Sequence, residues 1–259
     1  MNRNVSDHPG ADLSRRLHLL ALRSDFLVGK QLSMKSGCIL DRFIFEGPHG
    51  GGDPIRIGLF AGIHGDERTG SEALLRLAET LVLRPGIAEG YNLHFYPICN
   101  PSGFDAGTRL SRSGKDLNRE FWKQSAEPEV MLLEREIHEQ RFHGLVSLHS
   151  DDTSDGIYGF VRGAVLTRSL LEPALRAAEK ILPRNDNAII DGFPAERGII
   201  SECYAGILTS PPKLENSPFE IIFETPHHAP AKAQVEAFVV AILSILAEYR
   251  KFIAFAADL

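Results

Sequence analysis

Short apolar runs alternate with amphipathic helical segments along this chain, and the alternation limits the folds open to it. Four apolar runs end at glycines or polar residues: 55–65, 91–101, 144–150 and 219–226. Periodic apolar positions predict four helices after them: 68–84, 127–140, 165–182 and 231–252. Strands that alternate with helices build a largely parallel sheet covered by helices. We therefore expect an α/β fold.

The rest of the sequence fits a single domain. A helix is expected over residues 11–29 and a strand over 38–45. A polar loop is expected over 102–121, and residues 183–217 are predicted to be irregular because they contain several Pro and Gly. No repeat or low-complexity linker interrupts the 259 residues, so we expect one domain, 1–259.

Composition narrows the possible partners and locations. A net charge of −6 argues against nucleic acid but allows a local basic site for a small anion. No stretch reaches the roughly 18 apolar residues that span a bilayer, so we expect no membrane partner. The apolar run over 17–22 is shorter than the about 7–15 residues of a secretion signal, so a cytoplasmic location is expected. The three cysteines form no CxxC pair, so neither a disulfide framework nor a thiolate zinc site is indicated.

A candidate metal site begins where the strand over 55–65 gives way to a helix. His64 and Glu67 are three residues apart there, and a turn at a strand end can aim both side chains at one point. His149 ends another apolar run and is a candidate third ligand. Two histidines and one glutamate form a known catalytic zinc-ligand set. The pattern therefore indicates one zinc ion per chain.

Each part of this pattern also has an ordinary explanation. An H-x-x-E pair is common by chance, and a lone histidine at a strand end is more often simply hydrogen-bonded. Glu224 lies in an apolar strand, where a carboxylate needs a partner or a function. The stretch 151–155 carries three carboxylates, which could cap a turn, orient His149 or favour a cationic substrate.

Four motifs, taken in order, resemble the zinc metallocarboxypeptidase family and its relatives. The motifs are GIHGDERTG, NPSGFDAGTRLSRSGKDLNREF, SLHS and FETP. The relatives include the murein peptide amidases and the aspartoacylase and succinylglutamate desuccinylase group. The resemblance covers about 55–150 and 200–226, and it implies a mixed, mostly parallel β-sheet flanked by helices.

The resemblance also implies roles in catalysis. The H-x-x-E motif and the later histidine make His64, Glu67 and His149 the metal ligands. The glutamate of the late strand makes Glu224 the general base. Arg109, in GTR, resembles the family arginine that polarises the scissile carbonyl.

The same resemblance implies roles in substrate binding. Asn118 and Arg119, in D-L-N-R, would hold a substrate carboxylate, although Arg119 could instead pair with Asp116 or Glu120. Tyr204 precedes the proposed base by twenty residues, where the family often has a mobile tyrosine over the substrate. A packed aromatic is the alternative for Tyr204.

These roles form a coherent hydrolytic mechanism. Zinc lowers the pKa of a bound water toward about 7. A nearby carboxylate can carry its proton to a leaving amine, and an arginine can stabilise the oxyanion. We therefore expect a zinc metallopeptidase, a metallocarboxypeptidase or peptide amidase. Its expected substrate is a small peptide or acyl amino acid with a free carboxylate next to the scissile amide.

Two other functions compete with this one. An N-acyl amino acid deacylase of the desuccinylase and aspartoacylase type would share the metal and Arg119. That group usually carries a β-rich domain after its catalytic glutamate, whereas the residues after Glu224 here are predicted to form one helix, which favours the compact carboxypeptidase arrangement. The third possibility is a non-catalytic module that binds a carboxylate ligand, against which Glu224, Arg109 and Arg119 argue together.

Overall fold

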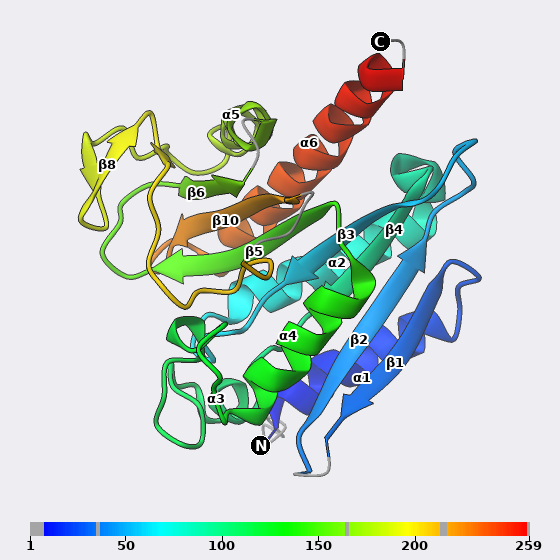
Figure 1. Ribbon diagram of the computed structural model, residues 1–259, viewed down its shortest axis with the longest axis horizontal. Coiled ribbons are helices and arrows are strands. Elements are labelled where there is room, and N and C mark those ends of the chain that lie inside the picture. Colours follow the sequence, from blue (N-terminus) through cyan, green and yellow to red (C-terminus); the bar gives the residue numbers. More distant parts are fainter. Residues whose placement is uncertain (1–7, 35–36, 164–165, 213–216, 258–259) are drawn as a thin grey trace, which may run out of the picture.

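One sheet of ten strands runs through the computed structural model, which describes residues 8–34, 37–163, 166–212 and 217–257 (Figure 1). Its strands lie in the following order: β1 (Leu27–Ser33), β2 (Ile39–Glu46), β4 (Tyr91–Tyr96), β3 (Ile55–Phe60), β5 (Gly144–Asp151), β10 (Phe219–Pro226), β6 (Tyr158–Gly163), β9 (Ile199–Ile200), β8 (Phe193–Glu196) and β7 (Ile189–Ile190). The central strands β4, β3, β5 and β10 are parallel, and antiparallel pairs flank them on both sides. The predicted mixed α/β sheet is therefore confirmed.

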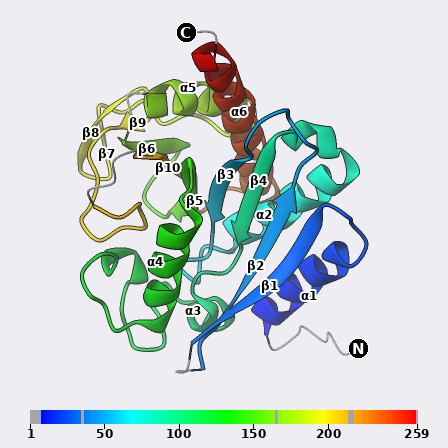
Figure 2. The ribbon, with the colours of Figure 1, turned by 45° about the vertical axis from the view of Figure 1, so that its right-hand side comes forward.

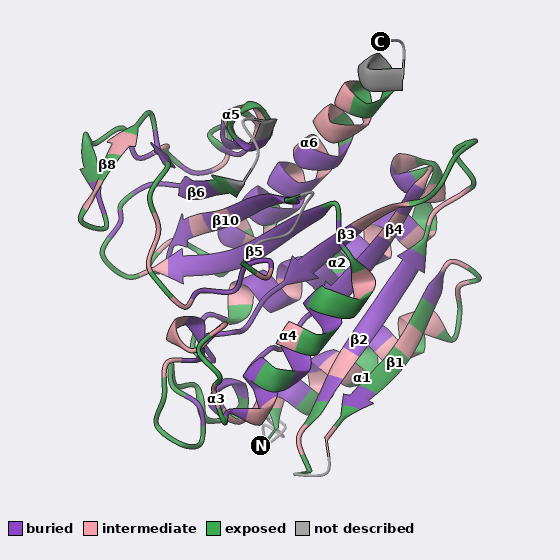
Figure 3. Ribbon diagram, in the orientation of Figure 1, coloured by how far each residue is buried: buried purple, intermediate pink, exposed green. Residues whose placement is uncertain are grey.

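Helices cover both faces of this sheet (Figure 2). One face packs against four helices: α1 (Pro9–Ala21), α2 (Arg68–Leu83), α5 (Leu166–Ala178) and α6 (Ala231–Ala257). The other face packs against α4 (Pro128–Gln140), whose Leu132, Leu133 and Ile137 are buried with Phe60 of β3. The short α3 (Pro101–Ala106), η1 (Pro85–Ala88) and η2 (Leu117–Arg119) lie in the connections. Buried residues concentrate on the central strands between these layers (Figure 3).

The structure corrects several boundaries. The helix expected over 11–29 ends at Ala21. The next residue, Leu22, is 83% exposed and so does not continue the buried face of the helix. The chain then turns at Ser24, whose hydroxyl accepts the Phe26 N–H. Leu27 is buried as the first residue of β1. The polar loop contains α3 and η2, and the segment expected to be irregular contains β7, β8 and β9. Strand β6 was also not predicted. No helix within the described ranges is long and apolar enough to cross a membrane.

Strand register brings the proposed base close to a proposed metal ligand. Strands β5 and β10 are parallel, and Glu224 of β10 pairs with His149 of β5. Side chains alternate between the two faces of a sheet, so these paired residues point to the same face. Both stand near the carboxyl ends of their strands, where ligand sites of open α/β sheets lie.

Candidate metal centre and pocket

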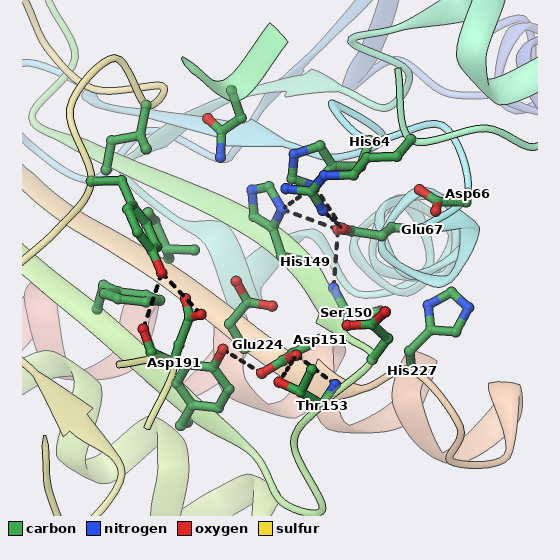
Figure 4. A pocket seen from close by; sticks show the side chains of 18 of the residues that line it. His64, Asp66, Glu67, His149, Ser150, Asp151, Thr153, Asp191, Glu224 and His227 are labelled. Atoms are coloured by element: carbon green, nitrogen blue, oxygen red, sulfur yellow. Dashed lines mark hydrogen bonds and ion pairs between the residues drawn. The ribbon is translucent and has the colours of Figure 1, made fainter. Parts of the chain in front are cut away.

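A cavity of about 520 Å³ opens at the carboxyl ends of β3, β5 and β10 (Figure 4). It is lined by all eight residues that the sequence singled out: His64, Glu67, Arg109, Asn118, Arg119, His149, Tyr204 and Glu224. These residues come from segments that are far apart along the chain. The fold therefore brings them together at one place.

Three of them form a compact group of metal-ligating atoms. His64 Nδ1 lies 2.6 Å from Glu67 Oε1, and His149 Nδ1 lies 3.0 Å from Glu67 Oε2. The two Nδ1 atoms are 3.3 Å apart, and all three residues are buried. Two zinc–nitrogen bonds of about 2.0–2.1 Å at a tetrahedral angle span about the same distance. The group therefore fits a metal ion.

The turn after β3 depends on two glycines. Gly62 has a φ of +62°, a conformation that favours glycine. At Gly65, a Cβ atom would lie 1.9 Å from the backbone carbon of Gly103. Larger residues at these positions would force the turn away from its place. Helix α2 then begins at Arg68, directly after Glu67.

The outer nitrogens of both histidines have hydrogen-bond partners. His64 Nε2 lies 3.1 Å from Asp116 Oδ1, and His149 Nε2 lies 3.0 Å from the Ser147 hydroxyl. Metal-ligating histidines are commonly oriented in this way through their other ring nitrogen. These contacts leave both Nδ1 atoms directed at Glu67, as a metal site requires.

The histidines and carboxylates of this group stabilise one another's charged forms. Burial by itself would raise the pKa of Glu67, but the neighbouring His149 and His64 imidazoles hold that pKa well below its ordinary value. Burial likewise opposes a charge on His64, yet its hydrogen bonds to Asp116 and Glu67 raise the pKa of His64. The backbone N–H of Ser150 also donates to Glu67 Oε2 (3.0 Å). Glu67 is therefore held as a carboxylate.

Glu224 lies in the cavity between the metal-ligand group and the Asp191 side chain (Figure 4). Burial raises the pKa of Glu224 well above its ordinary value, and the nearby carboxylates of Glu67, Asp151 and Asp191 raise it further. No hydrogen bond holds this side chain among the described residues. A carboxyl group in this setting has a strong tendency to take up a proton.

Arg109 stands beside the metal-ligand group. Its Nε and Nη2 both donate to Asp116 Oδ2 (3.2 and 3.0 Å), and its Nη1 lies 3.5 Å from Glu67 Oε1. Asp116 therefore bridges Arg109 and His64, and these two partners hold the pKa of Asp116 well below its ordinary value despite burial. The sequence had indicated Asp116 only as a possible partner of Arg119.

Asn118 and Arg119 lie on η2 at another wall of the cavity. The Asn118 Oδ1 accepts the Leu208 N–H (2.9 Å), so the side-chain NH2 is the group left to donate. Arg119 pairs with neither of its suggested partners, because Asp116 pairs with Arg109 and Glu120 pairs with Lys115. Among the described residues, the Arg119 guanidinium has no carboxylate partner and is available for an anion.

The acidic stretch after His149 forms a turn. Asp151 Oδ1 accepts the backbone N–H and the hydroxyl of Thr153 (2.7 Å each). Asp151 Oδ2 accepts the hydroxyl of Tyr158 (2.8 Å). These bonds support the turn interpretation of this stretch. No described contact joins Asp151 to His149.

Comparisons with known proteins agree with this architecture. The Succinylglutamate desuccinylase/Aspartoacylase catalytic domain matches residues 54–185, just over half of the chain. Carboxypeptidase SOL1 of Arabidopsis thaliana is 33% identical over 103 residues, which cover 34% of this chain and 21% of that protein. The chain therefore matches about a fifth of the length of this relative.

Solved structures share the fold at low sequence identity. A proposed metallopeptidase from Shewanella amazonensis superposes with a TM-score of 0.77 at 21% identity, covering 93% of each chain. A metallo-carboxypeptidase from Burkholderia cenocepacia gives 0.73 at 16% identity, covering 94% of this chain and 69% of that one. One from Pseudomonas aeruginosa, solved with (2-guanidinoethylmercapto)succinic acid, gives 0.67 at 18% identity and covers 90% and 67%.

The fold is that of the metallocarboxypeptidases, and its pocket contains a buried His-Glu-His group that could hold a metal ion. The family match over 54–185 covers just over half of the chain. The chain therefore belongs to the succinylglutamate desuccinylase/aspartoacylase catalytic domain family. The resemblance inferred from the four sequence motifs is thereby confirmed.

Proposed function

We propose that this chain is a zinc-dependent hydrolase that cleaves a peptide or peptide-like amide bond next to a free carboxylate. The main support for this proposal is that one cavity contains three features. These are a group that could hold zinc, the separate carboxylate of Glu224, and Arg119, which has no carboxylate partner among the described residues. His64, Glu67 and His149 would hold one zinc ion, and the whole chain would act as one domain. The substrate would be a small peptide or an acyl amino acid.

Each remaining residue has a role that its position supports. Zinc, when bound, supplies a Lewis acid that activates water at neutral pH. Glu224 would accept a proton from the attacking water and return it to the leaving amine. Arg109 would stabilise the negative charge that develops on the scissile carbonyl oxygen.

Arg119 and Asn118 would bind the substrate carboxylate. A guanidinium can bind a carboxylate through two parallel hydrogen bonds, and the free NH2 of Asn118 adds a neutral donor. Tyr204 would cover the bound substrate, because its ring packs against Arg119 at the same wall.

The test combines metal analysis with a substrate panel. Purified protein should contain about one zinc per chain and should hydrolyse peptides with a free C-terminus faster than amidated ones. Glu224→Gln should retain the zinc and lose hydrolysis. An active Glu224→Gln variant would refute the role of Glu224, and protein that never retains metal at neutral pH would refute the proposal.

An N-acyl amino acid deacylase is the second candidate, and the family match favours it directly. It would use the same zinc site and the same Arg119. N-succinyl and N-acetyl amino acids, assayed beside peptides, separate the two candidates. Faster turnover of the acyl amino acids would establish the deacylase.

A further inference from the structure

The hairpin formed by β7 and β8 places a carboxylate at the edge of the cavity. Its two-residue loop is Asp191-Gly192, and these residues have φ values of +51° and +80°. Two left-handed residues in this order, Asp then Gly, are typical of a type I′ hairpin turn. The turn therefore fixes where Asp191 stands, although nothing in its sequence context marked it as a functional residue.

Asp191 holds the phenol of Tyr204. The Tyr204 hydroxyl lies 3.0 Å from both the carbonyl oxygen and the Oδ1 of Asp191, so it donates to this one residue. The same ring makes a T-shaped contact with Phe193 of β8, with 4.8 Å between the ring centroids. The hairpin thus anchors both the tip and the side of the tyrosine.

The Tyr204 ring also covers Arg119. The Arg119 guanidinium carbon lies 4.2 Å from the centre of the Tyr204 ring, which is a cation–π distance. The Nη1 of Arg119 donates to the Asn118 carbonyl (2.8 Å), and this second contact fixes the plane of the guanidinium. A chain of contacts therefore runs from the hairpin tip through Tyr204 to Arg119.

We propose that Asp191 is a positioning residue that holds Tyr204 against Arg119 and so sets the affinity of the site for a carboxylate. The inference rests on the proposed function, in which Arg119 binds that carboxylate. A guanidinium held on one face and at one nitrogen loses less side-chain freedom when a ligand binds, so the same hydrogen bonds give a tighter complex.

Electrostatic repulsion alone would give Asp191 the opposite effect on carboxylate affinity. Asp191 is an anion near a site for anions, so its charge alone would weaken carboxylate binding, and its removal would tighten binding. If Asp191 acts by holding Tyr204, its removal weakens binding instead. The direction of the change therefore separates the two roles.

The test measures the affinity of zinc-loaded full-length protein for succinate and for (2-guanidinoethylmercapto)succinic acid by calorimetry. Asp191→Gly removes the carboxylate and suits the left-handed turn. It should raise Kd about threefold, because the backbone acceptor remains, and Tyr204→Phe should raise it about fivefold, the effect of one hydrogen bond. Asp191→Asn keeps a side-chain acceptor and should stay within about twofold of wild type.

A double-mutant cycle completes the experiment. The variant with both Asp191→Gly and Tyr204→Phe should bind no more weakly than Tyr204→Phe alone, because the two residues act through one contact. Additive losses, or tighter binding by Asp191→Gly and Asp191→Asn, would overturn the inference. For Asp191→Gly, KM for a free-carboxylate substrate should rise in parallel with Kd, while kcat stays near the wild-type value.

Arg119→Ala distinguishes this inference from the proposed function. If Arg119→Ala binds succinate weakly and the Asp191 variants bind as wild type does, Asp191 has no positioning role and the carboxylate site stands. If Arg119→Ala binds as wild type does, the carboxylate role of Arg119 fails, and the inference fails with it. Circular dichroism melts verify that every variant is folded.

Discussion

His64 Nδ1 and His149 Nδ1 lie 3.3 Å apart, although 85 positions separate the two residues in the sequence. One carboxylate, that of Glu67, contacts both nitrogens. Two imidazoles and a carboxylate buried at this spacing need either a shared proton or a shared cation. We expect the state with the shared cation to be the functional one.

Removal of a ligand should abolish metal binding. We expect His64→Ala and His149→Ala to lose more affinity than the roughly 10–100-fold that loss of an outer-shell partner costs. Metal content after dialysis at neutral pH measures this. His227→Ala is the matched control, because His227 lines the cavity outside the ligand group. Equal metal in all three variants would contradict the assignment.

Asp116 should matter to metal binding without being a ligand. It contacts His64 Nε2 and thereby favours the tautomer with a free Nδ1. Asp116→Ala should weaken zinc binding by roughly 10–100-fold in a chelator competition. Asp66→Ala removes an exposed cavity carboxylate that contacts neither histidine and should keep wild-type affinity. If both variants behave alike, Asp116 acts only through net charge.

Arg119 should discriminate between free and blocked carboxylates. Arg119→Ala should lower kcat/KM for free-carboxylate substrates by roughly 10–150-fold, equivalent to about 1.5–3 kcal/mol for a charged hydrogen-bonded contact. Arg119→Lys should restore little of this, because lysine lacks the planar pair of donors. Arg112→Ala, a change at an exposed arginine, is the control. An equal loss on amidated substrates would rule out carboxylate recognition.

His94 should make stability depend on pH. Burial, together with the nearby Arg42, Arg56 and Lys30, lowers the pKa of His94 from 6.5 to about 3. Above pH 6.5 the histidine is neutral in both the folded and unfolded chains, so its contribution is fully present. Between pH 6.5 and 3 only the unfolded chain binds the proton, and the free energy of unfolding should fall by up to about 1.4 kcal/mol per pH unit.

Urea unfolding between pH 4 and 7.5 measures this slope. His94→Leu places an apolar side chain against Phe142, which makes a T-shaped contact with His94, and should flatten the curve. His138→Gln changes an exposed histidine and should leave the slope as it is. A His94→Leu curve parallel to the wild-type curve would show that other groups cause the pH dependence.

The sequence was sufficient to predict the centre of the fold and the three residues that gather at the candidate metal site. The strands of the sheet centre are apolar runs, and His64 and Glu67 lie in a turn whose glycines, Gly62 and Gly65, are visible in the sequence. The peripheral elements were missed for a physical reason. Strands β7 and β9 are two residues long, so they show no periodicity and form only against their neighbours.

Two contributors to the cavity were missed for a related reason. Asp116 belongs to a recognised motif, but its bond to His64 depends on how the loop folds over the turn after β3. Asp191 precedes a glycine in a proline-rich segment, and Asp-Gly is a hairpin signal that was available there. No pattern in that segment indicated that the tip of the hairpin would contact Tyr204.

The pairing of Glu224 with His149 has a consequence for how this protein tolerates insertions. Because side chains alternate between sheet faces, a single residue added within β10 ahead of Glu224 would turn its carboxylate to the opposite face, where Phe223 packs against Phe238 of α6. Residues added between β9 and β10 would leave that alignment intact. Laboratory diversification of substrate range is therefore best directed at the stretch just before β10, with the strand itself kept unchanged.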